Sequence, residues 1–127
     1  MALQVLLAED TEMNRLLVRI LLTRIGCEVD EVEDGRQALE ALARKRYDLV
    51  LMDCMMPVMD GYEATRILRA REAVAGTPPV PVIALTASAI AGDRERCREA
   101  GMDDYMAKPF QADEFTAMVQ RYLGMRP

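Results

Sequence analysis

Acidic, hydroxyl and ammonium side chains follow apolar runs at four places that lie far apart in the chain. They are Glu9 with Asp10, Asp53, Thr86 and Lys108. In a parallel α/β sheet the carboxyl ends of the strands lie along one edge, and ligands bind in the crevice at that edge. We therefore expect these side chains to converge there. Carboxylates, a hydroxyl and an ammonium together suit a Mg²⁺-dependent transfer of a phosphoryl group to a carboxylate.

The adjacent carboxylates Glu9 and Asp10 have two interpretations. Mg²⁺ prefers hard oxygen ligands in octahedral geometry, commonly one or two carboxylates with water and phosphate oxygens. A side chain directly before a helix can instead cap it, and both Asp10 and Thr11 are of the preferred type. Taken alone, the pair favours capping over metal binding.

Asp53 ends an otherwise apolar strand, so its carboxylate needs a metal or a cationic partner at a desolvated edge. A loop-side cap or a salt bridge would explain an isolated Asp53 equally well. A carboxylate can also act as a covalent nucleophile, as in aspartyl-phosphate formation. Thr86 and Lys108 would then donate to phosphate oxygens, although each alone has an ordinary explanation, as a strand residue and as a solvated cation. The joint placement of these groups carries the prediction.

Size and composition indicate one domain over residues 1–127. A hydrophobic fraction of 51% with 5% aromatic residues suits a core of aliphatic side chains and methionine. No apolar run approaches the roughly 18 residues that span a bilayer. No basic segment with a hydrophobic stretch marks the N-terminus as a secretory signal. We therefore expect a cytoplasmic domain that does not itself insert into a membrane.

Charge and residue counts exclude several kinds of chemistry. A net charge of −5 and a pI near 4.8 argue against direct nucleic-acid binding, which favours basic patches. Cys27, Cys54 and Cys97 lack metal-ligand spacing and suit a reducing compartment. The chain contains no histidine. This excludes histidine ligands, histidine acid–base chemistry and a phosphohistidine carried by this chain.

Strand and helix patterns alternate five times, which predicts a parallel sheet with helices on both faces. The expected strands are residues 4–8, 28–32, 49–52, 81–85 and 104–107. The expected helices begin near residues 11–12, 36, 62, 90 and 112, and end before Gly26 and near residues 46, 73, 100 and 123. Gly26 suits the left-handed conformation that follows many helices. Right-handed crossovers leave few strand orders, of which we expect 2-1-3-4-5.

Together these motifs resemble the receiver domain of two-component signalling, the phosphoacceptor module of response regulators and hybrid histidine kinases. The resemblance extends from Val5 to about Leu123. It lies in four segments, LAED at 7–10, LMDCMMPVMDG at 51–61, ALTA at 84–87 and AKPF at 107–110, of which the second is the most specific. The resemblance implies a flavodoxin-like, doubly wound parallel sheet of five strands with five helices, in agreement with the pattern above.

The resemblance implies an acceptor and a metal site. Asp53 corresponds to the phosphoacceptor. Glu9, Asp10 and Asp53 correspond to the carboxylates that bind Mg²⁺, with the backbone carbonyl of Met55 as a further ligand. Mn²⁺ would suit the same hard oxygen ligands.

The resemblance also implies a conformational switch. Thr86 corresponds to a hydroxyl that moves toward the phosphoryl group, and Tyr105 to an aromatic side chain whose rotation accompanies that movement. Lys108 corresponds to the phosphate-binding lysine, and the Lys108–Pro109 peptide bond is usually cis in this family. Phosphorylation adds a charge of about −1.5 to −2, which Thr86 and Lys108 can bind.

Three further stretches look more like receivers of hybrid kinases than like those of transcription factors. They are residues 12–15, 88–94 and 97–105. Thr11 departs from the asparagine that is frequent there, but it can still cap a helix. The implied partners are a histidine kinase or histidine phosphotransfer domain as donor and an output protein. Both a separate protein and a part of a membrane-anchored hybrid kinase fit this resemblance.

Two apolar stripes run along the first expected helix. One comprises Leu17, Val18, Leu21, Leu22 and Ile25, and is wide enough to face the sheet. The other comprises Met13, Leu16 and Ile20. Because a helix on a sheet buries one face, we expect the second stripe to be partly exposed beside the phosphoacceptor, where exposed apolar surface often marks an interaction site. Wider burial or scattered exposure is the alternative. In the third expected helix, Arg66, Arg69 and Arg71 with Glu72 are expected on a solvated face.

A Mg²⁺-dependent phosphohydrolase with an aspartyl nucleophile is the main alternative of another class. Haloacid-dehalogenase-type enzymes carry a second aspartate two residues after the nucleophile, and here that position is Met55. A degenerate receiver that only binds partners is a third possibility, which the intact Asp53, Thr86 and Lys108 disfavour. We therefore expect a phosphoacceptor signalling domain that promotes its own phosphorylation and dephosphorylation, rather than a metabolic enzyme.

Overall fold

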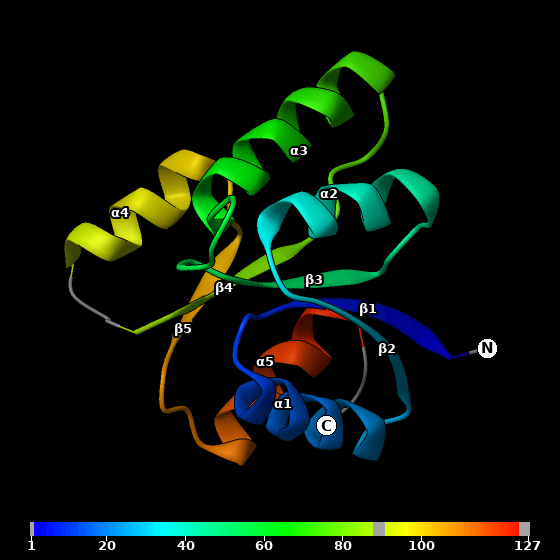
Figure 1. Cartoon of the computed structure of the whole chain (residues 1–127). Helices are drawn as coiled ribbons and strands as arrows, with labels where there is room; N and C mark the ends of the chain where they lie inside the picture. Colours follow the sequence, from blue (N-terminus) through cyan, green and yellow to red (C-terminus); the bar gives the residue numbers. More distant parts are fainter. Residues whose placement is uncertain (1, 88–90, 125–127) are drawn as a thin grey trace.

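The computed structural model describes residues 2–87 and 91–124 of the chain. Within them, strands and helices alternate in the expected order (Figure 1). The elements are β1 (Leu3–Ala8), α1 (Glu12–Arg24), β2 (Cys27–Val32), α2 (Gly35–Arg44), β3 (Leu49–Asp53), α3 (Gly61–Ala75), β4 (Val82–Thr86), α4 (Ala91–Ala100), β5 (Asp104–Ala107) and α5 (Ala112–Tyr122). All strand pairs are parallel, in the order β2-β1-β3-β4-β5. The predicted α/β class, strand order and flavodoxin-like topology are confirmed.

Hydrophobic side chains pack on both faces of the sheet. α1 and α5 cover one face, and α2, α3 and α4 cover the other (Figure 1). Along β1, Val5 and Leu7 belong to the core on the side of α1 and α5, and Leu6 and Ala8 to the core on the side of α2, α3 and α4. The alternation of side chains along a strand requires this. Every residue of β3 and β4 is buried. The polar side chains of these two strands stand at their carboxyl ends.

The boundaries of the elements agree closely with the sequence pattern, and the differences have local causes. β4 begins at Val82 because Pro81 has no N–H to donate to a neighbouring strand. α3 continues to Ala75 and ends where Gly76 adopts a left-handed φ of 72°. Gly26, with a φ of 86°, takes the expected left-handed conformation. The predicted helix start at Ile90 lies outside the described residues.

The helices of the described segments are all too short or too polar to cross a membrane.

The sheet-facing stripe of α1 is narrower than predicted. Val18, Leu21 and Leu22 are buried, but Leu17 is 47% exposed. Its assignment to the core is therefore wrong. Leu17 instead lines a surface cavity with Leu85 of β4 and Phe110, so its side chain lies next to the segment that follows β5.

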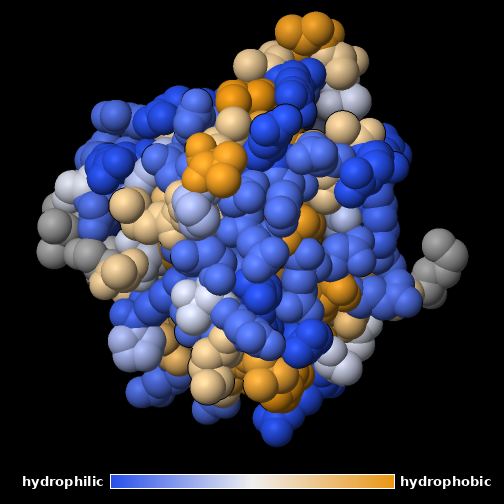
Figure 2. All heavy atoms as spheres, viewed as in Figure 1, coloured by the Kyte–Doolittle hydropathy of each residue, from blue (hydrophilic) through white to orange (hydrophobic). Residues whose placement is uncertain are grey.

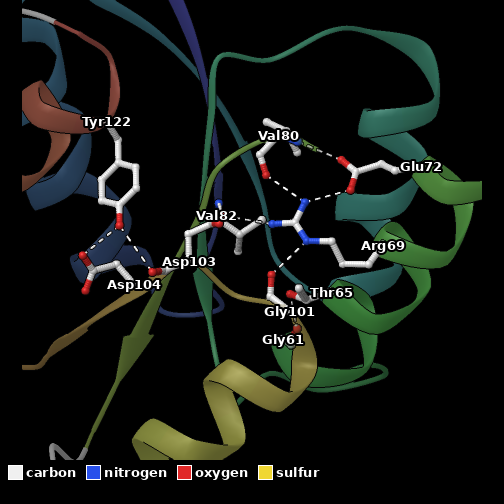
Figure 3. A network of polar contacts seen from close by, with 10 residues as sticks. All are labelled: Gly61, Thr65, Arg69, Glu72, Val80, Val82, Gly101, Asp103, Asp104 and Tyr122. Atoms are coloured by element: carbon white, nitrogen blue, oxygen red, sulfur yellow. Dashed lines mark hydrogen bonds and ion pairs between the residues drawn. The ribbon is translucent and has the colours of Figure 1, made fainter. Parts of the chain in front are cut away.

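Arg69 of α3 joins separate segments at the edge where β4 and β5 begin (Figure 3). Its guanidinium donates to the backbone oxygens of Gly101 and Val80, each over 2.8 Å. It also pairs with the carboxylates of Glu72 at 2.8 Å and Asp103 at 3.0 Å. The predicted solvated position is therefore wrong for Arg69, because the turn after α4 folds back onto α3 and meets this side chain. It is also wrong for Glu72, which accepts the Val80 N–H over 2.8 Å and is only 11% exposed.

Replacement of Arg69 should destabilise the domain. Arg69→Met leaves two carbonyl groups and two carboxylates without their shared donor, so we expect the free energy of unfolding to fall by about 2 kcal/mol. Arg71→Met, at an exposed position of the same helix, is the matched control. Urea unfolding followed by circular dichroism measures both. Equal stability of the two variants would contradict the structural role of Arg69.

Candidate functional site

The carboxyl ends of four strands meet at one edge of the sheet and carry the predicted side chains. Asp53 and Thr86 are the last residues of β3 and β4, and Glu9 and Lys108 directly follow β1 and β5. The parallel register keeps these ends level, with Asp53 opposite Leu85. The Lys108 N–H donates to the Thr86 carbonyl oxygen over 2.7 Å. Residues that are far apart in sequence thus form one site, as predicted.

Lys108 lies between two of the carboxylates. Its ammonium is 2.5 Å from a carboxylate oxygen of Glu9 and 3.0 Å from one of Asp53. The Glu9 and Asp53 side chains are 1% and 8% exposed, and that of Lys108 is 22% exposed. Charge-assisted hydrogen bonds of this kind are strong when water is largely excluded. They hold the Asp53 carboxylate in a fixed position at the rim of the sheet.

Glu9, Asp10 and Asp53 form a compact acidic cluster. Each offers a carboxylate oxygen, and these oxygens lie within 4.8 Å of one another. Hard oxygen donors at such separations suit Mg²⁺, which binds through one or two carboxylates and keeps several waters. The donor set therefore fits the predicted ion.

The capping interpretation of the acidic pair does not hold in the structure. Thr11 occupies the N-cap position of α1, but its side chain makes no capping hydrogen bond. Its N–H instead donates to the Glu9 carboxylate over 3.0 Å. The turn between β1 and α1 thus holds the Glu9 carboxylate where it can pair with Lys108.

Burial and crowding of charge set the protonation of this cluster. Burial, supported by the nearby negative charge of Glu9, raises the pKa of Asp53 to about 6 despite the attraction of Lys108. Burial also opposes ionisation of Glu9, but hydrogen bonds from Lys108 and from the Thr11 N–H outweigh it and lower the pKa of Glu9. Burial likewise opposes the charge of Lys108, but its two carboxylate partners raise its pKa. One ammonium leaves the cluster short of positive charge, which favours a further cation.

The loop after β3 fixes Asp53 from the other side. The Met55 N–H donates to the Asp53 carboxylate over 3.2 Å, and the Met55 side chain is exposed. Metal binding by the Met55 carbonyl stays a prediction. Gly61 has to be glycine, because a Cβ there would collide with the backbone carbonyl oxygen of Asp53. This close approach was not predicted; the glycine at the start of α3 was its signal in the sequence.

The two predicted switch residues lie on neighbouring strands. Thr86 is 4% exposed at the end of β4. Tyr105 lies on β5, paired in register with Ala84 of β4. The guanidinium carbon of Arg94, from α4, lies 5.0 Å from the centre of the Tyr105 ring. Tyr105 thus lies between β4, with which its strand pairs, and α4, which contacts its ring. The Lys108–Pro109 peptide bond is cis, as the resemblance implied.

An apolar surface on α1 borders the site. Met13 is 73% exposed, Leu16 41% and Ile20 44%, so the predicted exposure of this stripe is confirmed and Leu17 adds to it. Figure 2 shows hydrophobic side chains gathered in the lower part of the molecule, where Figure 1 places α1. Beside the stripe lies a cavity of about 320 Å³ that Leu17, Lys108 and Phe110 help to line. The apolar surface thus continues from α1 to the edge of the acidic cluster.

Comparison with known proteins gives consistent matches over almost the whole chain. The sequence profile of the response regulator receiver domain matches residues 5–120. The sensor protein GacS of Pseudomonas syringae pv. syringae is 41% identical over 122 residues, a match that covers 96% of this chain and 14% of GacS. The chain therefore spans about one seventh of that relative's length.

Two solved structures extend the comparison. The receiver domain of sensor histidine kinase PA1611 from Pseudomonas aeruginosa PAO1 is 45% identical, with a TM-score of 0.85 over 98% of this chain and 99% of that one. That structure has a magnesium ion coordinated in its active site cleft. The receiver domain of Ssk1 from Saccharomyces cerevisiae, solved with the histidine phosphotransfer protein Ypd1, is 25% identical, with a TM-score of 0.91 over 95% of this chain and 88% of that one.

Proposed function

This chain belongs to the response regulator receiver domain family, and we propose that it accepts a phosphoryl group from a partner's phosphohistidine onto Asp53. It is a phosphorelay signalling module rather than a metabolic enzyme, and Glu9, Asp10 and Asp53 form its active site. The observation that carries the proposal is the position of the Asp53 carboxylate, between the acidic pair and 3.0 Å from the Lys108 ammonium. The aspartyl phosphohydrolase alternative is set aside on the family match.

Mg²⁺ is the ion that we propose for the acidic cluster. Glu9, Asp10 and Asp53 would hold it, together with the Met55 carbonyl. When bound, it supplies the positive charge that lets an anionic phosphoryl group approach three carboxylates. The magnesium ion in the P. aeruginosa receiver domain supports this assignment. The expectation of Mn²⁺ as an alternative has no support in the comparisons.

The chain's own residues would perform the transfer and transmit it. Asp53, held by Lys108 and the Met55 N–H, would attack phosphorus in line, and the P–N bond to the donor's imidazole would break as the new O–P bond forms. Lys108 would then exchange carboxylate partners for a phosphoryl oxygen, and the Thr86 hydroxyl would donate to another. Because Thr86 ends β4, this movement would reposition Tyr105 and the Arg94 side chain stacked on it. Such a local electrostatic change can bias a two-state element and so alter contacts with an output protein.

The proposed donor is a histidine kinase or a histidine phosphotransfer domain, because this chain has no histidine of its own. The complex of the yeast receiver domain with Ypd1 supports a donor of this kind. The kinases among the relatives support a place within or beside a sensor kinase. We propose that the domain lies in the cytoplasm, either alone or as part of a membrane-anchored kinase. Direct binding of nucleic acid is not part of the proposal, since the chain carries a net charge of −5.

A phosphotransfer assay tests this function. A histidine phosphotransfer protein carrying labelled phosphate is mixed with the chain and Mg²⁺, and label should move to the chain. The proposed donor class would be contradicted if acetyl phosphate labels the chain but every histidine phosphotransfer protein tested keeps all of its label.

The exposed stripe of Met13, Leu16 and Ile20 is the proposed docking surface for that donor. A helix that presents phosphohistidine to Asp53 has to approach this edge, and the stripe offers it an apolar contact. Truncation of a central apolar anchor costs about 2 kcal/mol or more. We therefore expect Leu16→Ala and Ile20→Asp to slow transfer from the protein donor by at least about tenfold.

Acetyl phosphate needs no docking surface, so its labelling of both variants should stay at the wild-type rate. Val74→Asp is the matched control, since Val74 is an exposed apolar residue, 91% accessible, at the far end of α3. An equal loss with both donors would identify the stripe as structural instead.

A further inference from the structure

Among the three acidic residues, Asp10 has the side chain with the fewest contacts to hold it in place. Glu9 accepts hydrogen bonds from the Thr11 N–H and from Lys108, and Asp53 accepts from the Met55 N–H and from Lys108. Asp10 is exposed, and within residues 2–87 and 91–124 no hydrogen bond or ion pair is found for its carboxylate. The direction of the Asp10 side chain therefore depends on how the backbone before it is held.

Arg15 holds that backbone. Its guanidinium donates to the carbonyl oxygen of Glu9 over 2.8 Å, and this carbonyl belongs to the peptide unit that joins Glu9 to Asp10. The Glu9 N–H is bonded in turn to the Val32 carbonyl oxygen of β2 over 3.0 Å. Both backbone groups of Glu9 are thus fixed, one by the sheet and one by a side chain.

Arg15 is itself held from several sides. The backbone N–H of Arg15 donates to the Thr11 carbonyl oxygen over 3.0 Å in the first turn of α1. Its guanidinium lies 3.6 Å from the Glu31 carboxylate and 3.8 Å from that of Glu33, and its side chain is 16% exposed. The planar guanidinium presents five donors in a rigid fork, so one group can serve a carbonyl and two carboxylates together.

We propose that Arg15 is a positioning residue for the metal site: it holds the Glu9–Asp10 peptide so that the Asp10 carboxylate points into the acidic cluster. The proposal rests on the proposed function, since it concerns binding of Mg²⁺ by that cluster. Arg15 touches neither the ion nor the phosphoryl group. It acts as the outer partners of metal ligands do, whose loss commonly lowers metal affinity 10- to 100-fold.

Simple electrostatics predicts the opposite sign. Arg15 is a cation near a metal site, and its removal makes the potential at the acidic cluster more negative. If Arg15 acted only through its charge, its loss would strengthen Mg²⁺ binding. If it positions Asp10, its loss weakens binding. The direction of the change therefore separates the two roles.

The test is a Mg²⁺ titration followed by the backbone amide signals of the site in nuclear magnetic resonance spectra. Arg15→Gln should raise the Mg²⁺ dissociation constant about tenfold. Arg15→Lys keeps the charge but loses the fork, so it should show a smaller, several-fold rise. Arg19→Gln is the matched control, because Arg19 pairs with the same Glu31 at 2.9 Å but forms no bond to Glu9. It should leave the dissociation constant at or slightly below the wild-type value.

The outcomes are distinct. An Arg15→Gln dissociation constant equal to or below that of the wild type overturns the positioning role. If Arg15→Gln does not fold, Arg15→Lys decides, and wild-type affinity in that variant overturns the proposal. A purely structural role would lower the unfolding midpoint and leave the dissociation constant unchanged. Failure of the wild-type protein to bind Mg²⁺ would instead contradict the proposed function, and this proposal with it.

Discussion

Asp53→Asn is expected to take up no phosphoryl group from acetyl phosphate under conditions that label the wild-type protein completely. An amide does not form the acyl phosphate that a carboxylate forms. The other two carboxylates are poor substitutes, because Glu9 is fully buried against Lys108 and Asp10 is assigned to the metal. Phosphate incorporation measured by intact mass or by radiolabel gives the result directly.

Asp60→Asn is the matched control for this variant. Asp60 lies in the same loop after β3, but its carboxylate caps α3 by accepting the Glu63 N–H over 2.8 Å. Asparagine caps helices about as well as aspartate. Asp60→Asn should therefore be labelled like the wild type. Undiminished labelling of Asp53→Asn would mean that another residue is the acceptor.

Removal of the metal is expected to have the second large effect. Excess EDTA should stop labelling of the wild-type protein, because three carboxylates with only one ammonium leave a net negative charge that repels an incoming phosphoryl group. Burial, together with the nearby negative charge of Glu9, already raises the pKa of Asp53 to about 6. Asp10→Asn removes one ligand and should slow labelling at least about tenfold at limiting Mg²⁺.

Labelling rates measured across a range of Mg²⁺ concentrations test this second prediction. Asp113→Asn removes an exposed carboxylate from the first turn of α5 that does not belong to the acidic cluster, and should behave as the wild type does. Full labelling in excess EDTA would contradict the role assigned to the acidic cluster.

The sequence was sufficient to predict the site because the site lies at strand ends. In a sheet covered on both faces, β3 and β4 are continuous apolar runs, so the first polar residue after each run marks the edge. Asp53 and Thr86 follow from this rule alone. The parallel order of the strands then brings Glu9 and Lys108 to the same edge. The identity of the family added the roles of these residues.

The errors concern side chains whose partners come from other elements. Arg69 has the sequence context of a solvated helix residue, yet the turn after α4 reaches it from more than 30 residues away, as the span from Arg69 to Gly101 shows. Leu17 fits a sheet-facing stripe, but the segment after β5 determines what that part of α1 contacts. Arg15 bonds a backbone carbonyl, which no residue pattern records. Helix periodicity indicates a face; the tertiary fold decides what lies against it.

The most direct measurement of the central claim is chemical localisation of the phosphoryl group. Borohydride reduces an aspartyl phosphate to homoserine, which stays in place through proteolysis and peptide sequencing by mass spectrometry. After treatment with acetyl phosphate and Mg²⁺, the wild-type chain should contain homoserine at position 53 and at no other position. Homoserine at another aspartate, or a phosphate that survives borohydride as a serine or threonine ester, would contradict the assignment of Asp53 as the phosphoacceptor.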